Sequence, residues 1–276
     1  MCHGVCLAYT TEEGGVLSSS GELTSAQENE LRWLAVFGGV GFAVLTLIGW
    51  ALWAAPAFPH LSPGLPSLSA SPALLDRYYR EHGDTARAGA LAGTLALLPL
   101  LCFLVALYAR MRSREGGAAP FSLLALLAGI MVCVVHFVFL SFLFQAAFAP
   151  TTVGSQVTLA MHYAGTAGAA ASVLYATFLF AVAVSTLRYE SLPRWTGLFA
   201  AIAAPLQLLY IPSIFGAQHI FDVTDGLFGV YCTFGTFLAW FIAAGIAMAR
   251  RSPLPTAAGA RSAGDSPARS LGVAAN

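Results

Sequence analysis

FSLLALLAGIMVCVVHFVFLSFLFQAA, residues 121–147, is a continuous apolar stretch that contains no Asp, Glu, Lys or Arg. An α-helix rises about 1.5 Å per residue and the hydrocarbon core of a bilayer is about 30 Å thick, so about 20 apolar residues can cross it. The stretch therefore predicts a transmembrane helix. It also holds one histidine, His136, close to its centre, where a polar ring is costly and often functional.

Five more stretches of similar length and composition occur along the chain, and their interiors also contain no Asp, Glu or Arg. They are residues 33–54, 87–109, 157–187, 196–216 and 227–249. Together with 121–147 they predict an all-α protein, a polytopic membrane helix bundle of six transmembrane helices.

The composition excludes several classes of function. The chain is 58% hydrophobic and 9% charged, with a mean hydropathy of +0.74, whereas soluble domains contain about 25% charged residues. All 13 basic residues are Arg, so a retinal Schiff base or a P-loop lysine is excluded. The formal net charge is zero, so no nucleic-acid partner is expected.

The arginines predict the orientation in the membrane, because positively charged loops stay in the cytoplasm. Ten of the 13 lie on one side of the six stretches: Arg32, Arg110, Arg112, Arg114, Arg188, Arg194, Arg250, Arg251, Arg261 and Arg269. The other three, Arg77, Arg80 and Arg87, follow the first stretch. We therefore expect a multi-pass plasma-membrane protein with both termini in the cytoplasm. Trp50 and Trp53 would then belong to the aromatic belt of the outer interface.

The predicted organisation has three parts. Residues 1–31 form a cytoplasmic N-terminal tail, residues 32–250 the six-helix transmembrane domain, and residues 251–276 a disordered cytoplasmic tail rich in Pro, Ala, Gly and Ser. The outer loop, residues 55–86, is expected to contain a short interfacial helix.

The interfacial helix is predicted from PALLDRYYREH, residues 72–82. Ser71 is a typical N-cap before a proline at the first helical position, and Gly83 predicts the end of the helix. Leu74, Leu75 and Tyr78 are expected to face lipid.

Small residues recur at helical spacing and indicate close helix packing. Gly89 and Gly93 are four residues apart, Ala164, Gly168 and Ser172 follow the same step, and Gly38, Gly39 and Gly41 lie in the first stretch. Such faces join helices within the bundle, and they also suit a second copy of the chain or a membrane-protein partner.

Five uncharged polar residues are predicted near the bilayer midplane: His136, Gln207, Ser172, Tyr175 and Thr236. They are the candidate ligand-binding residues, lining one small polar cavity. The alternative is that they only form hydrogen bonds between helices, each contributing about 0.6–2 kcal/mol. Because no Asp, Glu, Arg or Lys accompanies them, proton-coupled transport and voltage sensing are disfavoured.

Metal and haem sites are weaker alternatives, and no cofactor or metal is predicted. Cys133 and His136 share a helix face, but Cys102 or Cys232 would have to complete the site. A haem held by two histidines fails because His162 lies about 15 Å from the depth of His136.

The outer surface offers another candidate cluster. His219, Asp222, Asp225, His162, Tyr163, His60, His82 and Asp84 are all predicted on that side. If they converge, they suit a divalent metal or a general base.

Two segments carry a family resemblance. LLDRYYREHGDTARAGALAGTLALLPLLCFLVALYARMR, residues 74–112, resembles the second-span region of a group of six-helix membrane proteins of high-GC actinobacteria, and LPRWTGLFAAI, residues 192–202, is similar to another part of them. The resemblance covers about residues 33–250. It implies fold and origin, and it assigns no active residues.

Three functions remain open. The favoured one is non-enzymatic: binding or moving a small apolar or lipid-like molecule through the midplane cavity, with membrane lipids as partners. The second is a structural or accessory subunit of a membrane complex. The third is a membrane-embedded, metal-dependent enzyme that uses the His and Asp residues of the outer face.

Overall fold

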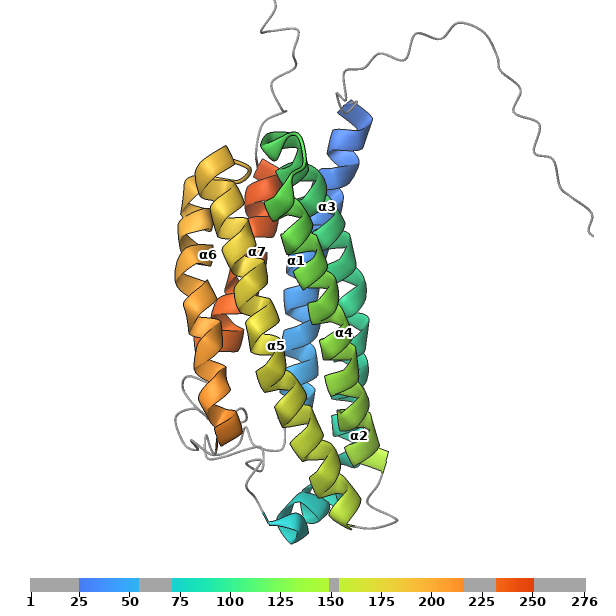
Figure 1. The fold of residues 1–276 in the computed structure, drawn as a ribbon. Coiled ribbons are helices and arrows are strands. Elements are labelled where there is room, and N and C mark those ends of the chain that lie inside the picture. Colours follow the sequence, from blue (N-terminus) through green and yellow to red (C-terminus); the bar gives the residue numbers. More distant parts are fainter. Residues whose placement is uncertain (1–24, 55–70, 149–153, 216–231, 251–276) are drawn as a thin grey trace, which may run out of the picture. The chain divides into compact units, whose positions relative to one another are not determined.

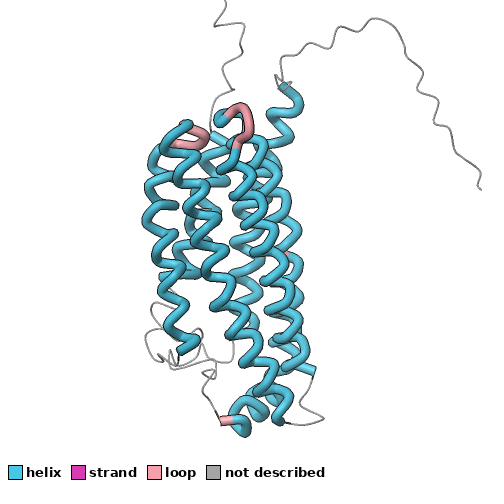
Figure 2. The backbone as a smooth tube through the Cα atoms, in the orientation of Figure 1, coloured by secondary structure: helices cyan, strands magenta, loops and turns pink. Residues whose placement is uncertain are grey.

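The computed structural model describes residues 25–54, 71–148, 154–215 and 232–250, and every regular element in these ranges is a helix (Figure 2). The elements are α1 (Ser25–Ala54), α2 (Pro72–Leu95), α3 (Leu97–Glu115), α4 (Pro120–Phe148), α5 (Gly154–Tyr189), α6 (Arg194–Gln207), the 3-10 helix η3 (Leu208–Phe215) and α7 (Thr236–Arg250). Residues 29–252 form one compact unit, and residues 1–28 with 253–276 form a second, of which only 25–28 are described.

Six helical segments are long and apolar enough to cross a membrane, as predicted. They are Glu28–Trp53, Pro72–Glu115, Pro120–Phe148, Gly165–Tyr189, Arg194–Pro212 and Cys232–Arg250. Large apolar side chains such as Leu98, Phe137 and Ile202 point outward and are more than half exposed. A soluble protein rarely exposes so much apolar surface, and a bilayer would cover it.

Within the compact unit, both ends of the helical bundle can be followed in Figure 1. The N-terminal end of α1, the connections after α3 and α5, and the end of α7 lie together at one end. Two contacts support this arrangement: Arg110 Nε donates to Ser191 O at 3.4 Å, and a Cβ on Gly245 would lie 2.9 Å from Ala35 O.

The second predicted span is two helices rather than one. α2 ends at Leu95 and α3 begins at Leu97, two residues before Pro99. A proline lacks the N–H that would bond the carbonyl four residues earlier, and its ring clashes with that carbonyl. Leu95 carries this carbonyl, so the break falls where the proline requires it.

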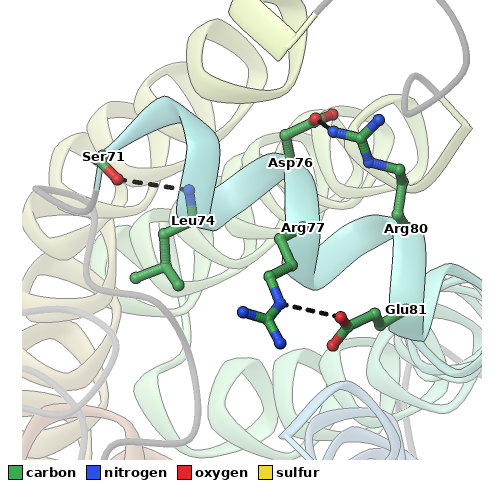
Figure 3. A network of polar contacts seen from close by, with 6 residues as sticks. All are labelled: Ser71, Leu74, Asp76, Arg77, Arg80 and Glu81. Carbon is green, nitrogen blue, oxygen red and sulfur yellow. Dashed lines mark hydrogen bonds and ion pairs between the residues drawn. The ribbon is translucent and has the colours of Figure 1, made fainter.

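The interfacial helix begins as predicted and ends differently. Ser71 is the N-cap, its Oγ accepting from Leu74 N at 3.4 Å, and Pro72 is the first helical residue. Ion pairs of Asp76 with Arg80 and of Arg77 with Glu81 run along this segment (Figure 3). The helix does not end at Gly83. It kinks at His82 (φ −127°, ψ 15°) and continues as α2 to Leu95.

The first turns of α2 pack against protein, so part of the lipid-facing prediction is wrong. Leu74 is half exposed, but Leu75 is 0% and Tyr78 is 9% exposed. Both belong to a cluster of buried apolar residues that includes Trp53, Leu143 and residues of the α4 and α5 ends. A kink lets the apolar face of a helix pack against its own bundle. An apolar face that contacts protein and one that contacts lipid have the same sequence pattern, so the sequence does not distinguish them.

The small-residue faces bring helix backbones together, as their spacing predicts. A Cβ on Gly89 of α2 would lie 2.6 Å from Gly49 O of α1, and one on Gly39 of α1 would lie 2.6 Å from Phe241 O of α7. Distances below 3.0 Å leave no room for any side chain. α1 is therefore held between α2 and α7 by contacts that only glycine permits.

The main core lies between α1, α3, α5 and α7 and is aromatic. Six rings form it in edge-on, tilted and stacked contacts: Phe42, Phe103, Phe178, Phe237, Trp240 and Phe241. Trp240 Nε1 satisfies its hydrogen bond with Thr196 O at 3.2 Å. The cavity described next adjoins this core, since Phe237 belongs to both.

Candidate functional site

A cavity of about 140 Å³ lies inside the bundle, between α1, α2, α4, α5, the α6–η3 junction and the start of the last span. An apolar cavity of about 150 Å³ is enough to hold one benzene molecule. On α5 it extends from Gly165 to Tyr175, about 15 Å of helix. Its wall is formed by Thr46, Gly49, Trp50, Trp53, Gly89, Ala90, Gly93, Val135, His136, Phe139, Leu140, Leu143, Gly165, Gly168, Ala171, Ser172, Tyr175, Gln207, Tyr210, Thr233, Phe234 and Phe237.

The wall carries no formal charge, since none of its residues is Asp, Glu, Lys or Arg. A charged ligand would leave water without a counter-charge, at a high cost in free energy. The wall includes the apolar rings of Trp50, Trp53, Phe139, Phe234 and Phe237. The cavity therefore suits a neutral and largely apolar molecule.

His136 and Tyr175 form a pair on this wall. The Tyr175 hydroxyl and His136 Nδ1 are 2.8 Å apart, and the rings of Phe42 and Phe139 pack edge-on against the imidazole. Either group can be the donor, depending on the histidine tautomer. In both cases the neutral pair keeps one further N–H or O–H after its mutual bond is made.

Gln207 is held by the start of the last span. Its Nε2 donates to Thr233 O at 3.0 Å and lies 3.3 Å from Thr236 Oγ1 and 3.4 Å from Ala203 O. Residues 232–235 are wound as a π-helix, which leaves carbonyls at unusual positions. Thr236 Oγ1 donates to one of them, Cys232 O, at 2.5 Å.

Four of the five predicted site residues line the cavity, and the fifth does not. His136, Ser172, Tyr175 and Gln207 belong to its wall, whereas Thr236 is not part of it. Thr236 instead positions Gln207 from the far side, through the contact at 3.3 Å. The structure thus brings these residues together, and the ligand-binding role of the group stays a prediction.

Sequence reasoning missed the contribution of α1. Thr46, Gly49, Trp50 and Trp53 follow the spacing of one helix face, and all four line the cavity. Trp53 is only 8% exposed, so its assignment to an interfacial belt is wrong. The i, i+3, i+4, i+7 spacing indicates that these four residues share one helix face. It was overlooked because tryptophans near the end of a membrane helix are typical of the interface.

Trp53 connects the cavity to the first turns of α2. Its Nε1 donates to the Tyr79 hydroxyl at 3.3 Å, and its carbonyl accepts from the Tyr78 hydroxyl at 2.5 Å. Tyr79 is buried. The end of the cavity near Trp53 is therefore held in place by the kinked part of α2.

The described residues do not complete the metal site considered for Cys133 and His136. Cys102, Cys133 and Cys232 are free thiols, and no three His, Cys, Asp or Glu side chains gather anywhere in the described ranges. The helix face shared by Cys133 and His136 supplies two ligands, and neither of the other cysteines reaches it.

The outer His and Asp cluster lies mostly outside the described residues. His60, His219, Asp222 and Asp225 are not described, and neither is the side chain of His162. Of the described members, Asp84 pairs with Arg87 and the His82 ring packs on Tyr78. The enzyme hypothesis built on this cluster stays a prediction.

Comparison of the chain with protein-family models, curated proteins and solved structures finds no match. The function is therefore argued from the cavity.

Proposed function

We propose that this protein binds a small, neutral, largely apolar molecule in the cavity between α1, α2, α4 and α5. The observation that carries the proposal is the wall itself: it is uncharged, rich in aromatic rings, and assembled from all six membrane-crossing segments. A volume of about 140 Å³ matches a single ring of benzene size. We further propose that the protein resides in the plasma membrane with both termini in the cytoplasm.

The test fills the cavity and measures ligand-dependent stability. Ala171 is buried on α5 and lines the cavity, so Ala171→Met places a longer side chain in it. A ligand that binds only the folded protein raises its stability by RT ln(1 + [L]/Kd). With toluene as the probe, the melting temperature of the purified protein in mild detergent should rise for the unmodified chain and stay constant for Ala171→Met.

The matched control is Ala176→Met, the same change on the same helix. Ala176 lies on a different groove, between α5 and α6, so this variant should respond to toluene like the unmodified chain. The control removes the effect of toluene on the micelle from the comparison. An equal response of all three proteins, or none in any, would contradict the proposal.

A further inference from the structure

Particular acceptor atoms of the cavity wall have no hydrogen-bond donor within the protein, and this defines the ligand more closely than size does. The inference rests on the proposed function. Gln207 shows the shortage best, being 1% exposed. Its Nε2 lies on two backbone carbonyls, Thr233 O and Ala203 O, which fixes the orientation of the amide because carbonyls only accept. Its Oε1 has no donor among the described residues.

Two hydroxyls on the same wall repeat the pattern. Ser172 is buried and gives its only proton to Ala169 O at 2.6 Å, so its oxygen can only accept from a ligand. Thr46 Oγ1 is buried with no hydrogen-bond partner in the part of the chain that the structure describes, so its hydroxyl is open both as an acceptor and as a donor. Buried polar atoms in proteins are nearly always paired. An acceptor on this wall is therefore completed by a donor that enters the cavity.

We infer that the ligand is a small neutral hydroxyl compound, a phenol or a cyclic alcohol, whose O–H donates to Gln207 Oε1. The ring occupies the aromatic part of the wall at Trp50 and Phe139. An aliphatic amine is excluded because it is protonated near neutral pH and the wall offers no counter-charge. A hydrocarbon, ether or ketone brings no donor and leaves Gln207 Oε1 unpaired.

The test compares phenol with anisole, which has the same ring with the hydroxyl methylated. Binding to the purified full-length chain is measured by the ligand-dependent melting temperature, with free ligand concentrations set by dialysis. The response of Ala171→Met, whose cavity is filled, measures the effect of each compound outside the cavity. A buried unsatisfied acceptor lowers affinity about tenfold or more. The unmodified chain should therefore bind phenol at least about tenfold more tightly than anisole.

Two variants separate the role of Gln207 from general effects. Gln207→Met keeps the length of the side chain and removes the acceptor, so it should bind phenol and anisole equally. Gln145→Met makes the same change at an exposed position of α4 and should keep the preference for phenol. If Gln207→Met does not fold, the comparison of phenol with anisole in the unmodified chain still decides the inference.

The contrary outcomes are distinct. Equal binding of phenol and anisole by the unmodified chain, with both lost in Ala171→Met, overturns the inference and leaves the proposed function standing. A phenol preference that survives in Gln207→Met overturns the assignment of Gln207. If neither compound binds at all and toluene is also without effect, the proposed function fails together with the inference.

Discussion

Gly89 decides how closely α1 and α2 approach each other. A Cβ added there would lie 2.6 Å from Gly49 O and 2.9 Å from Trp53 N. Both are backbone atoms and cannot rotate away. Gly89→Ala should therefore destabilise the protein by about 1–3 kcal/mol, the usual range for overpacking, as measured by thermal or denaturant unfolding in detergent.

Gly235 provides the control for this substitution. It lies at the start of the last span, and a Cβ there meets no atom within 4 Å. Gly235→Ala should leave stability unchanged within about 0.5 kcal/mol. Similar losses for both variants would show that the glycine contact does not hold α1 against α2.

Residue by residue, the candidate site was only partly predictable. His136 and Gln207 stand out in the sequence because each is a polar group near the centre of an apolar run, and both line the cavity. Thr236 shares that property but supports Gln207 from behind. Depth along a helix can be counted from the sequence, whereas the direction in which a side chain points depends on how each helix is rotated against its neighbours.

The kinked start of α2 is an element whose position depends on a few side chains. The Tyr78 hydroxyl donates to Trp53 O at 2.5 Å, and removing it by Tyr78→Phe should cost about 1 kcal/mol. We expect faster backbone hydrogen exchange over residues 72–82 and no change in α6 or α7. Mass spectrometry of peptides from exchange-labelled protein would measure this.

Tyr108→Phe is the corresponding control for the element. The Tyr108 hydroxyl accepts from Arg112 at 2.7 Å on the surface of α3, far along the chain from Trp53. Exchange over residues 72–82 should be unaffected by this change. If Tyr78→Phe behaves like Tyr108→Phe, the hydroxyl of Tyr78 does not anchor the segment.

The helices were predicted well where the length and composition of an apolar run alone determine them. The six long apolar runs all became helices, and Ser71 capped a helix as expected. The division at Ala96 and the kink at His82 were missed because they depend on local geometry within an otherwise continuous pattern. The resemblance to actinobacterial six-helix proteins remains a prediction.

At the scale of the whole molecule, the arrangement of the helices predicts a topology that can be measured. The N-terminal end of α1, the α3–α4 connection and the end of α7 lie at one end of the bundle. A fluorescent reporter that matures only in the cytoplasm should therefore fluoresce when it is fused after Asn276 or inserted after Gly117. Inserted after Thr151, between α4 and α5, it should stay dark.

A periplasmic alkaline phosphatase reporter at the same three positions is the complementary control, and it should be active only after Thr151. The Arg distribution predicts this direction, with Arg110, Arg112 and Arg114 near Gly117. Phosphatase activity at Gly117 and fluorescence at Thr151 would show that the bundle is inserted the other way round.

The contact between Gly39 and α7 has a consequence for biogenesis. Of the membrane-crossing segments in the described ranges, α1 is synthesised first and α7 last, yet Gly39 meets the backbone of Phe241 directly. During synthesis, α1 can pair with α2 early through Gly49 and Gly89, but its other face stays open until the final helix arrives. A chain that stops before Thr236 therefore leaves the face of α1 at Gly39 without its partner helix. An unpaired face of this kind is a defect that quality-control proteases recognise in nascent membrane proteins.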